Sequence, residues 1–441
     1  MRRSLVRAAA RLCLATVAAT ALVVLFLVLV VASDGAGSGL AGWLVTSSVG
    51  TAAALWLSRR HTRRGRLNRL LPVAAAAALT ASVCIPTLPT HRRDLADLPF
   101  VATQHWSLTT GSRIAVYHYP PAVGVPPHPT PLVYLHGGPI RGISLLDHRF
   151  LQLLAQQGYA VYAYEQAGGG RSDLLPMAQY TIDRLVRDLA AFADRLDQGP
   201  VDVLGFSSGA VVLTRALADP HIAARVHRAV IAEPGPIDGP TAGVSGHQGR
   251  QSARDLAPAP SGSRSTYLPR YGVAFGLMRF GLLGLDNGLI GQAEGVNAFT
   301  AADLGSDTAS AYCARDAHRI PAEDSAQNFS FNAAASLHVR QTIIDSPAIT
   351  PQLRLSSTPT MLMIAECSAQ VRQWQTAILA ADPGVQRTQY MPGVGHHMWN
   401  GLDDNNQRAA AVIATFLKNR PAPLPNYPTR TDIPAFLHSR K

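Results

Sequence analysis

The amino-acid sequence predicts an α/β fold, a mostly parallel sheet with helices on both faces, preceded by about three transmembrane helices. Three observations predict it. From residue 132 onward, short apolar strands alternate with helical segments. The pentapeptide at residues 205–209 (GFSSG) joins one of these strands to a helix. Residues 1–93 consist of apolar stretches separated by arginines.

The expected elements of the α/β region follow one another in a regular order. Two alternating runs between residues 105 and 119 flank a turn at 109–112 and predict an opening hairpin. The expected strands then cover residues 131–135, 159–164, 201–206, 227–232, 360–365 and 385–391, and the main helices cover 182–196 and 398–418.

This regular order is interrupted between residues 234 and 357. The stretch is too long for a strand-to-helix connection, and it mixes a Gly/Ser/Pro-rich piece with helical ones. We therefore divide the chain into a membrane region, two parts of one core, an insertion between them and a proline-rich tail. These parts cover residues 1–93, 100–233 and 358–418, 234–357 and 419–441, respectively.

Residues 205–209 match the pattern G-x-S-x-G, which marks a nucleophile elbow when it lies between a strand and a helix. The two glycines have a physical reason. Such a sharp turn pushes the backbone of Ser207 toward strained dihedrals, and side chains at positions 205 and 209 would clash with the turn. Ser207 is therefore expected to stand exposed above the sheet, where a nucleophile could reach a substrate.

Two further segments accompany this serine. A buried strand runs into His136-Gly137-Gly138-Pro139, the type of turn that supplies a backbone N–H to an oxyanion hole. The last expected strand is followed by a glycine-rich turn at residues 393–395 and then by His396. The chain order is thus oxyanion loop, serine, histidine.

With these motifs the chain resembles the α/β-hydrolase superfamily over residues 100–418, and within it the proline iminopeptidase branch. Members of that branch carry H-G-G-P-G and D-Q-R-G-x-G-x-S. Here the second motif reads EQAGGGRS over residues 165–172, with Glu165 for Asp and Ala167 for Arg, and Ile140 replaces the last glycine of the first motif. In this superfamily an insertion at residues 234–357 is the cap that shapes the substrate pocket.

The resemblance implies roles for the motif residues. Ser207 would be the nucleophile and His396 the general base, while the neighbouring His397 should point elsewhere. The N–H of Ser208 and one from Gly137 or Gly138 would stabilise the tetrahedral oxyanion. A serine where an aspartate would be required excludes the dehalogenase and epoxide-hydrolase chemistry of related families.

The carboxylate that should orient the histidine has two candidates. Most family members place an aspartate after the penultimate strand, and here Ser368 occupies that position. Glu366 stands two residues before it, and Glu233 directly follows the strand after the elbow helix. Both preserve the order serine, acid, histidine. We favour Glu233, because Glu233-Pro234 resembles a turn of hydrolases whose acid comes from that earlier strand, and Glu366 remains the alternative.

The motifs therefore predict a serine hydrolase that cleaves an amide or an ester through a Ser-His-Glu triad. The iminopeptidase-like motifs favour an aminopeptidase acting on short peptides, and cap carboxylates such as Glu294 and Glu323 would then grip the α-amino group. Hydrolysis of small or lipid esters is the first alternative. An inactive, membrane-tethered binding protein is the second, and the missing aspartate is its support. No cofactor or metal is implied, and the oligomeric state is left open.

The first 93 residues predict membrane spans at about residues 12–32, 40–57 and 70–88. Residues 1–93 hold twelve arginines and one acid, which equals the net charge of +11 of the whole chain. The remainder is therefore neutral overall and gives no support to nucleic-acid binding. Arginines before the first span and between the second and third should face the cytoplasm, which places the catalytic domain outside. Arg92 and Arg93 argue for the alternative, in which one short span fails to cross and the domain lies in the cytoplasm.

Four cysteines are present, and Cys13 and Cys84 fall within the expected spans. Cys313 and Cys367 remain. In an extracytoplasmic domain these two could form a disulfide, and two buried free thiols are the alternative.

Overall fold

The structure is a computed structural model that describes residues 104–197, 199–242, 332–367, 372–399 and 403–426, together with Ala102 and Cys313. Within these residues, no helix is both long enough and apolar enough to span a membrane. The expected spans at 12–32, 40–57 and 70–88 lie outside the described residues, as do Ser368, Glu294 and Glu323.

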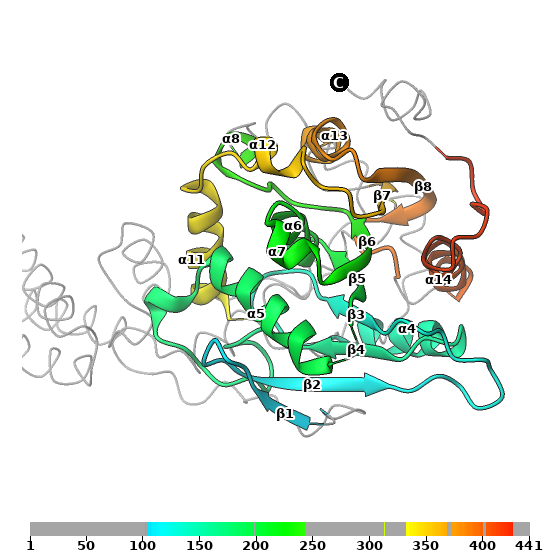
Figure 1. Cartoon of the computed structure of the whole chain (residues 1–441), viewed down its shortest axis with the longest axis horizontal. Helices are drawn as coiled ribbons and strands as arrows, with labels where there is room; N and C mark the ends of the chain where they lie inside the picture. Colours follow the sequence, from blue (N-terminus) through cyan, green and yellow to red (C-terminus); the bar gives the residue numbers. More distant parts are fainter. Residues whose placement is uncertain are drawn as a thin grey trace, which may run out of the picture. The chain divides into compact units, whose positions relative to one another are not determined.

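An eight-stranded sheet forms the centre of the described region, in the order β1-β2-β4-β3-β5-β6-β7-β8 (Figure 1). The pairs β1–β2 and β2–β4 are antiparallel, and every other neighbouring pair is parallel. The strands are β1 Gln104–Ser107, β2 Arg113–Tyr119, β3 Leu132–Leu135, β4 Val161–Tyr164, β5 Val201–Phe206, β6 Val226–Ala232, β7 Thr360–Cys367 and β8 Val385–Gly395. The expected α/β fold with a mostly parallel sheet is confirmed.

Helices cover both faces of this sheet, as the buried strands require. Helix α4 packs against α14 on one face, and α5 packs against α6 on the other (Figure 1). The bounds of these four helices are α4 Leu145–Gln156, α5 Ile182–Leu196, α6 Ser208–Leu217 and α14 Asp403–Leu417. Two further helices are α7 Pro220–Ala223 and α13 Arg372–Ala381. All residues of β3 and β5 are buried, because a parallel strand covered on both faces has no solvent side.

Side-chain alternation divides the core between these two layers. Tyr134, Leu204 and Met361 belong to the apolar cluster that also contains residues of α4 and α14. Trp399 stacks on Phe150 of α4 within the same cluster, with ring centroids 4.3 Å apart. Because successive strand residues point to opposite faces, every second position of a central strand serves each helical layer.

The two strands closest to the site extend further than their sequence pattern indicated. The expected strand at 360–365 continues to Cys367, and the expected strand at 385–391 continues to Gly395. The register between them shifts between Ala365 and Cys367, and Cys367 pairs with Gly395 beyond the shift. A local irregularity of this kind re-aims the residues that follow a strand, and His396 is the first residue after β8.

Only parts of the predicted cap insertion are described. They include α8 Gly239–Ala242, α11 Ala333–Ile344 and α12 Thr350–Leu353. Residues 243–331 lie outside the described part except for Cys313, so the cap boundaries remain a prediction. The start of the tail lies along the sheet edge, where Asn426 forms a bridge with Gln389 of β8.

Candidate active site

Ser207 occupies the turn between β5 and α6, with φ 52° and ψ −112°. Its N–H donates to the carbonyl of Ala232, which extends the β5–β6 ladder by one residue and fixes the turn. A Cβ at position 205 would lie 2.6 Å from the carbonyl oxygen of Gly209, and one at position 209 would overlap the carbonyl of Leu135. The elbow therefore needs both of its glycines, because the backbone fills the space that side chains would occupy.

His396 follows β8 and meets the serine directly. Its Nε2 lies 3.0 Å from the Oγ of Ser207, which is hydrogen-bonding distance. The imidazole is only 12% exposed and rests against the ring of Phe206, with centroids 5.1 Å apart. A nucleophile and a base in direct contact are the first requirement for activating a serine hydroxyl.

Glu233 comes directly after β6 and reaches the other ring nitrogen of the histidine. Its Oε2 lies 3.3 Å from Nδ1 of His396, and its side chain is fully buried. The other oxygen accepts hydrogen bonds from the N–H of Ala365 at 2.7 Å and from Nε2 of Gln375 at 2.8 Å. With φ 49°, the Glu233 backbone lies in the left-handed region, so its side chain is held by an unusual backbone conformation.

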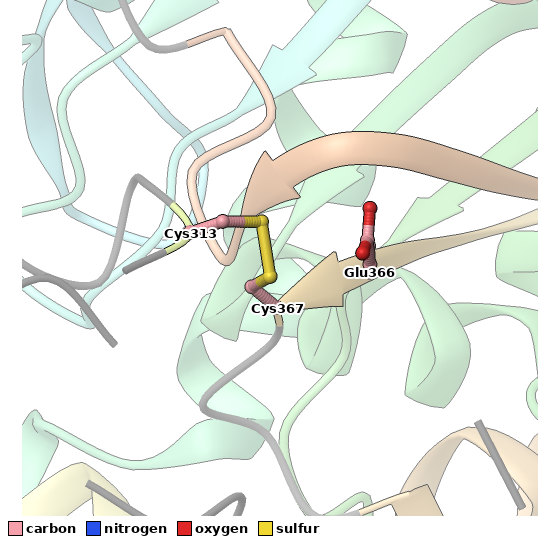
Figure 2. A group of neighbouring side chains, drawn as sticks. All are labelled: Cys313, Glu366 and Cys367. Atoms are coloured by element: carbon pink, nitrogen blue, oxygen red, sulfur yellow. A yellow bond between two sulfur atoms is a disulfide. The ribbon is translucent and has the colours of Figure 1, made fainter. Parts of the chain in front are cut away.

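Glu366, the alternative acid, lies at the end of β7, where its Oε2 accepts a hydrogen bond from the N–H of Gly393 at 2.8 Å. The residue sits beside a disulfide between Cys313 and Cys367 (Figure 2). The structure thus brings Ser207, His396 and Glu233 into one chain of contacts, while the carboxylate of Glu366 braces the backbone of β8. The role of either carboxylate in catalysis stays a prediction.

The disulfide joins Cys367, at the end of β7, to Cys313 of the predicted cap insertion, with their Cα atoms 5.2 Å apart. Cys313, Cys367 and Glu366 are also the one group of possible metal ligands that the described residues bring together. Metal binding by cysteine requires thiolates. Because both sulfur atoms are bonded to each other, this group does not offer them.

The predicted oxyanion loop lies against the nucleophile. A Cβ on Gly137 would approach the Phe206 ring to 2.7 Å and the Cβ of Ser207 to 2.9 Å, so only glycine fits there. Gly138 has φ +54°. Ser208 is the first residue of α6, where the backbone N–H has no acceptor within the helix. Gly137 and Ser208 therefore lie directly beside the serine, and Gly138 is the next residue of the same loop.

Ile140 shows how the loop tolerates its departure from the H-G-G-P-G motif. It keeps the left-handed conformation that glycine would adopt, with φ 59°, although it is β-branched. Its N–H donates to Oε1 of Gln166 at 2.7 Å, and its carbonyl accepts from the N–H of Asn332 at 2.9 Å. Hydrogen bonds on both sides hold a conformation that costs about 1–2 kcal/mol.

The EQAGGGRS motif at residues 165–172, which also departs from the family pattern, has a structural role next to the predicted oxyanion loop. Glu165 is buried, and its carboxylate accepts hydrogen bonds from the N–H of Arg171 at 2.5 Å, the N–H of Ile143 at 3.0 Å and the hydroxyl of Tyr117 at 2.8 Å. Burial raises the pKa of Glu165, although these hydrogen bonds oppose the shift. Glu165 thus joins the turn at Arg171 to the backbone at Ile143, which follows the oxyanion loop.

His397 points away from the serine, as expected, and faces a buried carboxylate. Its Nε2 lies 3.6 Å from Oδ1 of Asp147, and its ring stacks on Phe206 with centroids 4.9 Å apart. Sequence reasoning did not single out Asp147, its partner Arg141 or Gln375. The capping pattern Ser144-x-x-Asp147 was a signal for Asp147, whereas Gln375 reaches Glu233 only because α13 packs beside β7.

Three known proteins show what the chain is similar to. A putative non-heme chloroperoxidase from Synechocystis sp. is 33% identical over 106 residues, which is 24% of this chain and 37% of that protein. The crystal structure of an esterase from Rhodococcus sp. matches with a TM-score of 0.50 and 18% identity, over 73% of this chain and all of that one. A proline iminopeptidase from Mycobacterium smegmatis matches with a TM-score of 0.43 and 18% identity, over 72% and 98%.

At 18% identity, the match to the Rhodococcus esterase shows a shared fold alone and does not transfer a substrate. The expected proline iminopeptidase branch is therefore one neighbour among several. The family assignment rests on a wider match, since the Alpha/beta hydrolase family matches residues 132–413, which is more than half of the chain. That segment includes β3 to β8 and all of Ser207, His396 and Glu233. The chain belongs to the Alpha/beta hydrolase family.

Proposed function

We propose that the protein is a serine hydrolase that cleaves an ester or an amide through an acyl-enzyme. The observation that carries this proposal is the continuous set of contacts from the Ser207 Oγ to His396 Nε2, at 3.0 Å, and from His396 Nδ1 to Glu233 Oε2, at 3.3 Å. This is the arrangement of nucleophile, base and orienting acid that serine hydrolysis requires.

In the proposed mechanism, the Oγ of Ser207 attacks the carbonyl carbon of the substrate while its proton passes to Nε2 of His396. Glu233 accepts the hydrogen bond from Nδ1–H and stabilises the imidazolium that forms. The imidazolium then protonates the leaving alcohol or amine. A water molecule then attacks the acyl-enzyme and gives its proton to His396. As the bond from the acyl carbon to the Oγ of Ser207 breaks, His396 returns that proton to the Oγ and the acid product leaves.

The buried surroundings of Glu233 support this role. A buried carboxylate needs partners. The N–H of Ala365 and the amide of Gln375 satisfy one oxygen, and the other contacts Nδ1 of His396. Both oxygens of Glu233 thus have polar partners. This favours an active enzyme over the inactive binding protein, because a protein without catalysis would not need Ser207, His396 and Glu233 to remain in contact.

Labelling with a fluorophosphonate tests the proposal. We expect the unmodified protein to react and Ser207→Ala to lose the reaction completely. Ser336→Ala is a matched control, because its Oγ is buried without a hydrogen-bond partner among the described residues and it lies on α11, outside the proposed triad and oxyanion hole. Folded protein that never labels would overturn the proposal in favour of the binding protein.

The substrate class depends on the cap, most of which lies outside the described residues. We propose a small or lipid ester or a short peptide, with aminopeptidase activity and ester hydrolysis as the two candidates. Turnover of p-nitrophenyl butyrate and of alanine and proline p-nitroanilides separates them. Hydrolysis of the anilides alone indicates the aminopeptidase, and hydrolysis of the ester alone indicates the esterase.

We also propose that residues 1–93 anchor the enzyme in a bilayer with the catalytic domain outside the cytoplasm. The arginine distribution supports this orientation, and the Cys313–Cys367 disulfide supports an oxidising compartment. Resistance to alkaline carbonate extraction tests the anchor. Protease digestion of intact and inverted vesicles tests the sidedness, since the proposal requires the domain to be exposed on only the extracytoplasmic side.

A further inference from the structure

The carbonyl oxygen of Gly137 accepts two hydrogen bonds inside the oxyanion loop. Nε of Arg141 donates to it at 2.6 Å, and Nδ1 of His136 lies 2.9 Å from it. The Nε2 of His136 lies 3.2 Å from the N–H of Gln166, which can only donate. Nε2 is therefore the acceptor, and Nδ1 carries the proton that Gly137 receives.

The protonation state of His136 agrees with this assignment. Burial, together with the nearby Arg141 guanidinium, lowers the pKa of His136 to about 3, so the ring is neutral at physiological pH. A neutral ring has one donor and one acceptor, and both are used here. The Gly137 carbonyl is thus held from two sides by groups that keep their protonation state.

Fixing this carbonyl fixes the N–H on the same peptide. The bond between Gly137 and Gly138 is trans, as are all peptide bonds of the described residues. In a planar trans peptide the C=O and N–H point in opposite directions, so the N–H of Gly138 points away from Arg141. No acceptor within the described part of the chain reaches that N–H. Gly137 itself packs on Ser207, which places this free donor beside the nucleophile.

The N–H of Gly137 has a less suitable direction. The carbonyl oxygen of His136 belongs to the same peptide and faces Gly209 at the start of α6, since a Cβ there would lie 2.7 Å from it. The N–H of Gly137 therefore turns away from that helix. The N–H groups of the two glycines therefore point in different directions. The direction favours the N–H of Gly138 as the second oxyanion donor beside the N–H of Ser208.

Arg141 is itself held by a buried ion pair with Asp147. Nη1 lies 2.8 Å from Oδ2, and the side chains are 3% and 0% exposed. Asp147 also accepts hydrogen bonds from Tyr134, Ser144 and Trp399. Burial acts to raise the pKa of Asp147, but the Arg141 guanidinium and neighbouring donors hold it well below its usual range. The pair stays charged although buried ion pairs add little stability by themselves.

We propose that Arg141, anchored by Asp147, is a positioning residue that orients the Gly137–Gly138 peptide and thereby makes the N–H of Gly138 the oxyanion donor from this loop. The inference rests on the proposed serine hydrolase function. Without Arg141, the peptide could rotate and present its carbonyl oxygen to the developing negative charge, which would repel it.

Arg141→Lys tests the proposal. Lysine keeps the charge opposite Asp147, but its single ammonium cannot reproduce a planar fork that binds Asp147 and Gly137 at once. We expect kcat and kcat/KM on an aryl acetate to fall together by about 10- to 100-fold with KM unchanged, because the interaction is made only in the transition state. In the corresponding thionoacetate, sulfur replaces the carbonyl oxygen, and sulfur is a poor hydrogen-bond acceptor that gains little from an oxyanion donor. The rate on the acetate divided by the rate on the thionoacetate should therefore also fall.

Arg184→Lys is the matched control. Arg184 forms another buried pair, with Asp188 at 3.1 Å and exposures of 9% and 2%, and it contacts Ser112 rather than the oxyanion loop. A general loss of packing would affect both variants equally. Unchanged kcat and an unchanged acetate to thionoacetate ratio in folded Arg141→Lys would overturn the inference while leaving the proposed function intact.

A crystal structure of the fluorophosphonate adduct decides the matter even if Arg141→Lys does not fold. The inference requires the phosphonyl oxygen within about 3 Å of the N–H groups of Gly138 and Ser208. An oxygen bound by the N–H of Gly137 instead would overturn it. Absence of any Ser207-dependent reaction in the unmodified protein would overturn the proposed function and this inference with it.

Discussion

Glu233 and His396 lie 163 residues apart in the sequence, and their side chains meet with 3.3 Å between Oε2 and Nδ1. The contact arises because β6 and β8 both flank β7 and end at the same edge of the parallel sheet. A carboxylate after β6 can thus serve a histidine after β8, although one strand lies between them.

Replacing Glu233 by glutamine should lower kcat by about 10³- to 10⁴-fold, because an amide can neither hold the imidazole in the required tautomer nor stabilise its protonated form. Steady-state kinetics on an aryl ester measures this. Glu366→Gln is the matched control and should change kcat less than about tenfold, since Glu366 braces Gly393. The reverse order of effects would move the acid to Glu366.

Gly137→Ala should reduce kcat by at least about 100-fold, because the added methyl group would press on the Phe206 ring at 2.7 Å and displace the oxyanion loop. Kinetics together with circular dichroism measures the effect. Gly235→Ala provides a control at a neighbouring strand end, where a Cβ would meet Val211 at an ordinary 3.4 Å. Equal losses of kcat in Gly137→Ala and Gly235→Ala would contradict the assignment of Gly137 to the oxyanion loop.

Removing the disulfide should destabilise the domain. Because Cys313 and Cys367 are 54 residues apart, the double Cys→Ala variant should lose about 2–4 kcal/mol of unfolding free energy. Urea denaturation with and without dithiothreitol measures this, and the reductant should affect only the unmodified protein. Two titratable thiols at these positions in unfolded, unreduced protein would show that the bond does not form.

The stability of the domain should fall as pH rises from about 4 to 6 through the contribution of Asp202. Burial raises the pKa of this carboxyl to about 6, while in the unfolded chain it is about 3.9. The folded state therefore binds the proton more tightly, and its advantage is complete below about pH 4 and lost above about pH 6.

Asp202→Asn should accordingly raise the unfolding free energy by up to about 2–3 kcal/mol at pH 7 and by little at pH 4. The asparagine Oδ1 can still accept the hydrogen bond from His227, whose Nδ1 lies 2.8 Å from Asp202. Chemical denaturation at both pH values measures the difference. Asp173→Asn is the control. Its side chain is 52% exposed, so the substitution should change the unfolding free energy little at either pH value. A gain for Asp202→Asn at pH 4 as large as at pH 7 would contradict this account.

The sequence by itself determined the local elements of this protein. Apolar runs predicted the central strands, with β5 matching residues 201–206 and α5 matching 182–196, because burial on both faces and helical amphipathicity leave periodic traces. The glycine pattern around Ser207 also predicted the elbow, since steric exclusion acts between residues close in the chain.

Only the tertiary structure decided which distant side chains meet. The sequence left Glu233 and Glu366 as alternatives. It contained no sign that Gln375 would support Glu233, or that Arg141, paired with Asp147, would hold the Gly137 carbonyl. These contacts depend on strand order, on the register shift before Cys367 and on helix packing. Such properties follow from the free energy of the whole fold, which leaves no periodic pattern along the chain.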